Sequence, residues 1–333
     1  MPAVPESPPI DHLILPYAST GTPEQGQSPD WPELPHLAEL LARLQALPAD
    51  IGDEFRLSPP HERAWAAALE LTPAGQTLPD GLIPWAAWSA GVRDRACAWF
   101  TPCQWNVGAD QVRLQPPEAL ELGEDDSRAL LEALSPWAAE DGITLVWETA
   151  GRWRAEGDIF EALPWASLDR VAHRRVDAWL PDSGRWPQAA GLLRLLNETQ
   201  MLFYTHPVND RRQALGRPAI NGIWISGCGA WRHSTPADQA HGLELENALR
   251  PAALRGDHGE WKRTWEMLDA TLIVRLLAQV QRGQPLRLTL CGERTAQTWV
   301  TPASDHPRPW WQALLPGWRA RRRVPMAEVL GTL

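Results

Sequence analysis

Two runs, HPVNDRR (206–212) and GRPAINGIWISGCG (216–229), decide the fold prediction for this chain. Together they join a polar cluster, a short apolar strand expected over 222–226 and a glycine pair, a combination that packing alone does not explain. His206, Asn209 and Arg212 carry hydrogen-bonding groups suited to a phosphate or a carboxylate, since arginine offers a planar fork of donors. The same side chains are equally suited to capping and cross-linking the loop, so both interpretations stand.

The residues around the expected strand have structural and functional interpretations of their own. Asn221 is predicted to anchor a turn ahead of the strand, and it is also a candidate ligand-binding residue. The run 226–229 is predicted to form a tight turn that needs small residues. A backbone nest for an anion is the alternative. Cys228 is a weaker candidate for a nucleophile, because no histidine is paired with it in the sequence.

Composition favours a globular protein and disfavours several classes of partner. The chain has 333 residues, 44% hydrophobic and 22% charged, with a net charge of -10 and a pI near 5.4. This balance argues against nucleic-acid and membrane-surface partners, and the single basic run, 319–323, is predicted to be a solvated helix end. Without a signal-peptide pattern or an 18-residue apolar run, we expect a cytoplasmic protein.

Cysteine and tryptophan usage completes this picture. The four cysteines form no CxxC pair, so neither a disulfide framework nor a zinc ribbon is expected, and the thiols should be reduced. The sequence has 20 tryptophans against two tyrosines and four phenylalanines. Because many of them lie in apolar runs, we interpret tryptophan as the general aromatic filler of the core rather than as a stacking surface for a ligand.

Hydrophobic periodicity predicts alternating strands and helices. Residues 1–9 are Pro-rich and expected to be disordered. A β-β-α-β-β pattern begins near residue 96, whereas strands elsewhere alternate with helices, which points to an α/β sheet covered by helices on both faces. Strands are expected at 12–16, 96–101, 111–114, 143–147, 152–155, 222–226, 286–290 and 299–300, and helices at 34–44, 64–71, 84–91, 125–139, 189–204 and 260–281.

The opening runs resemble a motif of the archaeal-type, 2,3-bisphosphoglycerate-independent phosphoglycerate mutases, which belong to the alkaline phosphatase superfamily. Weaker similarities to that family lie at 34–37, 80–91, 97–107 and 262–269. The chain also resembles RpfE-like regulatory proteins of proteobacteria. The residues matching the mutase motif are His206, Pro207, Asn209, Arg212, Gly216, Pro218, Asn221, Trp224, Gly227 and Gly229.

This resemblance implies a fold and a domain plan. The fold would be an alkaline phosphatase-like mixed sheet covered by helices on both faces. Residues 10–95 and 181–333 would form this α/β domain from both ends of the chain. Residues 96–180 would form a smaller inserted α+β domain, in agreement with the change of pattern near residue 96.

The resemblance also implies a two-metal centre, whose ligands this sequence departs from. Enzymes of the superfamily use two divalent cations held by Asp and His, together with a Ser or Thr nucleophile. The first ligand position falls at 16–17, where Pro and Tyr stand. His61 takes the place of the nucleophile, and Ser58 lies three residues away; both are weak catalytic candidates. The other ligand regions retain only Asp257 and His258, out of register, and Glu293, one position along.

We therefore expect a phosphoglycerate mutase-like protein that has lost its two-metal site and needs no cofactor. Its role would be regulatory, or it would bind an anionic, phosphorylated small molecule; a protein partner is not identified. The alternative is an active phosphoglycerate mutase or phosphatase that uses Mn or Zn on shifted ligands, namely Asp53, His61, Asp257, His258 and Glu293.

Overall fold

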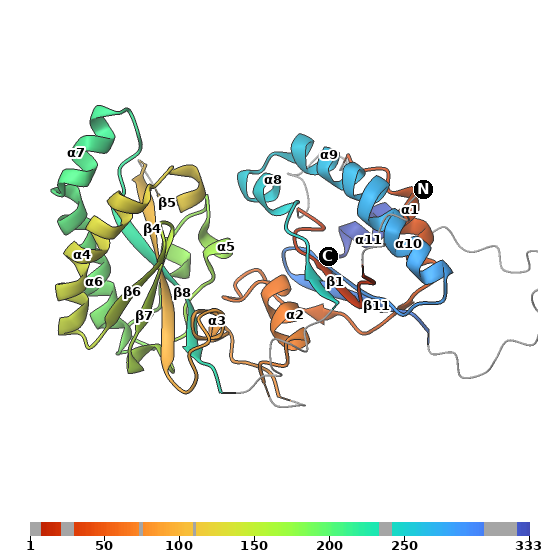
Figure 1. Ribbon diagram of the computed structural model, residues 1–333, viewed down its shortest axis with the longest axis horizontal. Helices are drawn as coiled ribbons and strands as arrows, with labels where there is room; N and C mark the ends of the chain where they lie inside the picture. Colours follow the sequence, from red (N-terminus) through yellow and green to blue (C-terminus); the bar gives the residue numbers. More distant parts are fainter. Residues whose placement is uncertain (1–7, 21–29, 73–75, 109–110, 233–241, 303–324) are drawn as a thin grey trace, which may run out of the picture. The chain divides into compact units, whose positions relative to one another are not determined.

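The chain folds into two compact units, the first built from Met1–Glu54 and Pro236–Leu333, the second from Phe55–Thr235. We call them the terminal unit and the inserted unit, and describe each by itself (Figure 1). The inserted unit is wider at both ends than the 96–180 expected from the sequence, because it also contains α2 (Pro60–Ala68), α3 (Trp85–Ser89) and β8 (Gly222–Ala230). The computed structural model describes residues 8–20, 30–72, 76–108, 111–232, 242–302 and 325–333.

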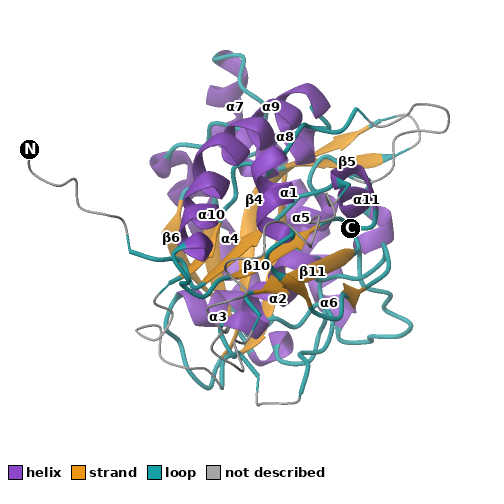
Figure 2. Cartoon of the chain, turned by 90° about the vertical axis from the view of Figure 1, so that its right-hand side faces the viewer, coloured by secondary structure: helices purple, strands orange, loops and turns teal. Residues whose placement is uncertain are grey.

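The terminal unit is built on a mixed sheet. Its strand order is β2-β11-β10-β1-β9, and β3 also pairs with β11. Strand β1 runs parallel to both β10 and β9, with Leu15 opposite Leu290. Strand β11 is antiparallel to β10, and the two lie side by side (Figure 2). The strands are β1 (His12–Leu15), β2 (Gln45–Ala46), β3 (Asp50–Ile51), β9 (Leu243–Leu245), β10 (Arg287–Cys291) and β11 (Thr295–Val300).

A long helical run covers the sheet of the terminal unit. Helix α9 (His258–Leu268) passes through a π-helical turn (Asp269–Ile273) into α10 (Val274–Gln281), and both the turn and α10 pack against α1 (Pro35–Leu41). The strand residues Leu13 and Leu288 and the helix residue Trp265 are completely buried in this core. Two shorter helices complete the unit, α8 (Arg250–Arg255) and α11 (Met326–Gly331).

The inserted unit is built on an antiparallel sheet. Its strand order is β5-β4-β7-β6, and β8 pairs with the other edge of β4. The long β4 holds the sheet together because it pairs with three other strands. The strands are β4 (Ala96–Val107), β5 (Val112–Gln115), β6 (Thr144–Thr149), β7 (Arg152–Glu156) and β8 (Gly222–Ala230).

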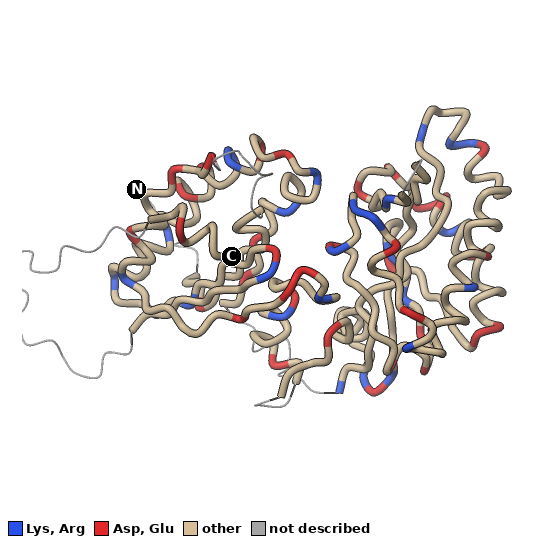
Figure 3. Tube along the Cα trace, turned by 180° about the vertical axis from the view of Figure 1, so that it is seen from behind, with Lys and Arg blue, Asp and Glu red and all other residues tan. Residues whose placement is uncertain are grey.

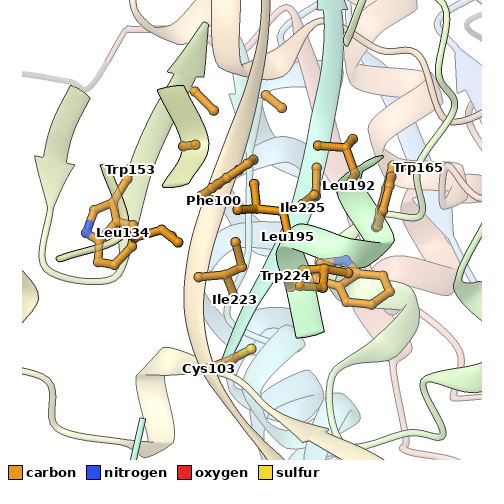
Figure 4. Packing of buried hydrophobic residues seen from close by; sticks show 14 of the residues in the cluster. Phe100, Cys103, Leu134, Trp153, Trp165, Leu192, Leu195, Ile223, Trp224 and Ile225 are labelled. Atoms are coloured by element: carbon orange, nitrogen blue, oxygen red, sulfur yellow. The ribbon is translucent and has the colours of Figure 1, made fainter. Parts of the chain in front are cut away.

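Helices lie on both faces of this second sheet. Phe100 and Ile225 point to the face covered by α4 (Glu124–Glu140) and α6 (Ala189–Tyr204), where they pack with Leu134 and Leu195 (Figure 4). Cys97 and Trp99 alternate with that face and meet α3 (Trp85–Ser89). The remaining helices are α2 (Pro60–Ala68), α5 (Leu168–Val171) and α7 (Pro207–Ala214), with short 3-10 turns at Pro117–Ala119, Asp158–Phe160 and Asp177–Trp179.

The predicted α/β class is confirmed, and so are most of the predicted elements. The sequence does not reveal β9, because three residues carry too little pattern. Tryptophan fills the cores as predicted: Trp153, Trp165, Trp224, Trp261 and Trp265 are fully buried. All four cysteines are free and buried.

Two further features of the described part of the chain are its distribution of charge and the length and apolarity of its helices. Basic and acidic positions are interspersed along it (Figure 3), and the basic run 319–323 lies outside the described residues. None of the described helices is long and apolar enough to cross a membrane.

Helix α1 is capped from another part of the chain. Leu34, at its N-cap, has no side chain that can accept a hydrogen bond. Asp269 fills this role: its carboxylate accepts from the main-chain nitrogens of His36 (3.2 Å) and Leu37 (2.8 Å) and from Nδ1 of His36 (2.9 Å). Only 3% of Asp269 is exposed. The π-helical turn that begins at Asp269 thus supplies the acceptor that the start of α1 lacks.

Replacing Asp269 by alanine should destabilise the terminal unit. Two main-chain donors would lose their partner, and each buried donor left unsatisfied costs about 1–3 kcal/mol. We expect a loss of at least about 2 kcal/mol in urea unfolding, with faster hydrogen exchange in the first turn of α1. Glu266→Ala, an exposed change one turn earlier on the same run of helix, is the matched control. Equal effects of the two substitutions would contradict the capping role.

Candidate functional site

His206 caps the helix that follows it. Its Nδ1 accepts a hydrogen bond from the main-chain nitrogen of Val208 at 3.2 Å, at the N-terminus of α7. Burial lowers the pKa of His206, and the nearby Arg211 lowers it further while Asp126 opposes them. A lowered pKa favours the neutral ring that can accept this bond. His206 is therefore a capping residue in this structure.

Asn209 joins the start of α7 to the chain before and after it. Its Nδ2 donates to the carbonyl oxygens of Phe203 and Ile220, both at 2.7 Å, and its Oδ1 accepts from the nitrogen of Ile220 at 2.8 Å. Only 7% of the residue is exposed. One amide side chain thus satisfies three buried main-chain groups.

The guanidinium of Arg212 donates hydrogen bonds to main-chain carbonyl oxygens. Nε donates to Pro218 at 2.8 Å, one terminal nitrogen donates to Leu120, and the other donates to Glu121 at 3.4 Å. The side chain is 1% exposed. These contacts join the loop after α7 to the segment ahead of α4, so the donors that suit an anion are used inside the fold.

Asn221 extends the pairing of β4 with β8 by one residue. Its side-chain amide accepts from the nitrogen of Trp105 at 2.7 Å and donates to the oxygen of the same residue at 3.0 Å. The next residue, Gly222, lies under the indole of Trp105, which a Cβ would approach to 2.9 Å. Asn221 thus ties the start of β8 to β4, whereas the sequence predicts that it anchors a turn ahead of the strand.

The 226–229 run forms a bulge inside β8 rather than a turn after it. The strand continues to Ala230, and the pairing register with β4 shifts between Cys97 and Trp99, opposite this run. Gly227 has φ +64° and lies against Trp85 and Ala86 of α3, so a larger residue would be strained and crowded. Burial raises the pKa of the Cys228 thiol, which disfavours the thiolate that a nucleophile requires.

The weak catalytic candidates lie at the start of α2. Ser58 does not cap this helix, since Pro59 holds the N-cap position. Its Oγ accepts from the nitrogen of Gly81 at 2.9 Å. His61 is buried, with Nε2 at 3.2 Å from Oδ2 of Asp169. The sequence does not predict the contact between His61 and Asp169, because Asp169 lies in α5, far along the chain.

Glu62 lies in the first turn of α2 and is partly buried. Its carboxylate accepts from Oγ of Ser167 and from Nε1 of Trp85, the latter at 3.2 Å. Burial raises the pKa of Glu62, and the neighbouring Asp169 adds to this, while His61 and the two hydrogen bonds act in the opposite direction. This cluster of Glu62, His61, Ser167 and Asp169 ties α2 to α5.

In the terminal unit, the end of β1 is closed by two indoles. Nε1 of Trp261 donates to the oxygen of Tyr17 at 2.8 Å, and Nε1 of Trp265 donates to the oxygen of Ala18 at 3.0 Å. The nitrogen of Ala18 donates to the oxygen of Cys291 at the end of β10. The carboxyl ends of parallel strands are the usual place for ligands in α/β sheets, and here packing and main-chain hydrogen bonds fill it.

The weak metal candidates do not assemble into a site. Asp257 caps α9 by accepting from the nitrogen of Glu260 at 2.8 Å. His258 stacks on Trp261, with ring centroids 5.1 Å apart. Glu293 follows Gly292 at the end of β10, whereas His61 belongs to the inserted unit. Across the described part of the chain, no three His, Cys, Asp or Glu residues gather into a group that could hold a metal ion.

Comparisons with known proteins leave the family of the chain open. No family model matches it, and no curated protein matches it. Among solved structures, it is similar to the PH0037 protein from Pyrococcus horikoshii, with 14% identity and a TM-score of 0.43 over 88% of this chain and 87% of that one. It is also similar to a cofactor-independent phosphoglycerate mutase from Thermoplasma acidophilum, with 13% identity and a TM-score of 0.32 over 88% and 90% of the two chains.

Arg212→Lys should destabilise the inserted unit although it keeps the charge. A lysine cannot reach the carbonyls of Pro218 and Leu120 together, and each buried acceptor left unsatisfied costs about 1–3 kcal/mol. We expect a loss of about 2 kcal/mol or more in urea unfolding. Arg211→Lys, at an exposed arginine that pairs with Asp126, is the control and should change little.

The same residues give a test of anion binding. If their donors are held by the main chain, 3-phosphoglycerate and inorganic phosphate should leave the melting temperature unchanged. A rise in melting temperature with either anion would contradict the view that these side chains serve only to hold the loops around α7, provided that folded Arg212→Lys protein no longer shows the rise.

Glu62→Gln should gain stability relative to the wild type as the pH rises. In the unfolded chain the carboxyl ionises above its ordinary pKa of 4.5, whereas burial holds its proton to a higher pH in the folded protein. The wild type is thus fully stabilised by this group below 4.5 and loses that contribution as the pH rises through the raised pKa. Glutamine stays neutral and has no such loss.

Urea unfolding across this pH range measures the difference between wild type and variant. Glu132→Gln, at an exposed position on α4, is the control and should give a nearly constant difference. A constant difference for Glu62→Gln as well would show that folding does not raise the pKa of Glu62.

Proposed function

We propose that this chain is a phosphoglycerate mutase-like protein of the alkaline phosphatase superfamily that acts without a two-metal centre, in a regulatory role. The ancestry is supported by the motif residues from His206 to Gly229, and the regulatory role by the resemblance to RpfE-like proteins. The loss of the two-metal centre is supported by the types of residue that stand at the ends of the strands. Pro16 and Tyr17 supply no carboxylate where the superfamily has its first ligand.

The single observation that carries the proposal is the closure of β1 by Trp261 and Trp265. Their indole nitrogens bond to the main-chain oxygens of Tyr17 and Ala18, and both side chains are fully buried. A metal centre needs several oxygen or imidazole ligands converging on an open position. Indoles donate hydrogen bonds and do not ligate cations, so this strand end is built as core.

The retained motif supports the same conclusion. Asn209, Arg212 and Asn221 bond to main-chain groups, and Gly222 and Gly227 permit close packing with Trp105 and α3. These contacts explain why the motif remains useful in a protein with no metal-dependent chemistry: the inserted unit needs it to fold.

Metal analysis and activity assays test the proposal. Purified protein should contain neither Mn nor Zn in stoichiometric amounts. It should also show no turnover of 3-phosphoglycerate or of a general phosphatase substrate with added Mn²⁺. An active cofactor-independent mutase in the same assays is the positive control. About two equivalents of bound metal per chain, or turnover that is lost on replacing Asp257, His258 and Glu293 by alanine, would instead establish the enzyme alternative.

The regulatory role has its own test in cells. Deletion of the gene should alter the transcript profile, and the Asp257→Ala/His258→Ala/Glu293→Ala variant should restore it as well as the wild type does. Restoration by the wild type alone, with equal amounts of both proteins, would show that these side chains have a chemical role.

A further inference from the structure

The carboxyl end of β10 is covered by a segment from the far end of the sequence. Leu333 lies directly on Gly292: a Cβ added to Gly292 would come within 2.5 Å of the main-chain oxygen of Leu333 and 2.7 Å of its Cβ. The oxygen of Leu333 also accepts a hydrogen bond from the nitrogen of Thr295 at 3.0 Å. Glycine is required here for space alone, because its φ lies outside the left-handed region.

The covering segment consists of the short amphipathic helix α11 and the two residues that follow it, Thr332 and Leu333. Leu330 is completely buried and Leu333 is 9% exposed, while Met326 and Val329 pack on the same core with partial exposure. The spacing of these residues is that of one apolar helix face. Ala327, Glu328 and Thr332 are exposed, so the segment attaches to the unit through one side only (Figures 1 and 2).

Helix α11 depends on this attachment for its own structure. It has six residues, and isolated helices shorter than about 12 residues are marginal in water. Its buried contact rests mainly on Leu330 and Leu333. The β10–β11 ladder, by contrast, has five residue pairs and is flanked by β1 and β2. The segment is therefore held by fewer contacts than the β10–β11 ladder beside it.

We propose that residues 326–333 are a latch, bound within the chain to a site at the carboxyl end of β10, which is released without opening the sheet. The site recognises an apolar helix face with leucines three residues apart and one main-chain oxygen facing Thr295. Release exposes Gly292 and the strand end at the edge where α/β sheets bind ligands. The latch thus controls the exposure of Gly292 and of the Thr295 amide at the end of β10.

Hydrogen exchange of the Thr295 amide reports the latch directly, because that amide donates to Leu333. In the full chain, Gly292→Ala should release the latch by steric conflict, and Leu333→Asp should release it because a carboxylate is disfavoured in the apolar contact. Each substitution should speed exchange at Thr295 by about tenfold or more, while the amides of the β10–β11 ladder keep their protection. Gly259→Ala is the control, because no atom lies within 3.4 Å of its added Cβ.

The double variant separates release from general damage. Once Leu333→Asp has released the latch, Gly292→Ala should add little further effect, a non-additivity expected of two residues in contact. Additive effects would overturn the proposal, as would unchanged exchange at Thr295 in both single variants. Loss of ladder protection together with Thr295 would also overturn it, since the segment would then be an integral part of the sheet. If Gly292→Ala does not fold, the exchange rates of the Thr295 amide and of the ladder amides in Leu333→Asp decide the question.

Discussion

Buried main-chain groups need hydrogen-bond partners, and in this protein polar side chains supply them wherever helices and strands leave a group unpaired. Asn209 and Arg212 do so at the loops around α7, and Asp269 does so at the start of α1. Trp261 and Trp265 do so at the end of β1. The contacts of Asp269, Trp261 and Trp265 join segments that are distant in sequence, and Arg212 also reaches Leu120, so packing and these bonds together fix how the segments lie within each unit.

This constraint changes what the polar motif means. Residues that can hold an anion are the same ones that can satisfy carbonyl and amide groups, so composition does not separate the two roles. Arg212 shows the difference: a guanidinium that is 1% exposed and bonded to carbonyl oxygens has no donor turned toward solvent. The buried acids have a different origin. Glu62 and Asp169 meet His61 and Ser167 between α2 and α5, where they form a second polar cluster of the inserted unit.

The edge of the terminal sheet shows how a usual ligand position can become structure. The ends of β1 and β10 are connected by the bond from Ala18 to Cys291 and closed by indoles on one strand and by Leu333 on the other. Closure by apolar residues removes water and leaves no charge that needs a partner. The cover of β10 depends on the few contacts made by α11 and Leu333. In the latch proposal, the modest free energy of these contacts decides whether the end of β10 is covered.

The sequence by itself determined the α/β class, most elements and the tryptophan-filled cores, because these follow from local periodicity. Tertiary structure alone decided the partners of Arg212, the burial of Glu62 beside Ser167, the cap from Asp269 and the contact of Leu333 with Gly292. The limits of the inserted unit, 55–235 rather than 96–180, likewise follow from packing. The physical reason is common to all of these: each depends on two segments far apart in sequence, whose meeting leaves no periodic pattern in either one.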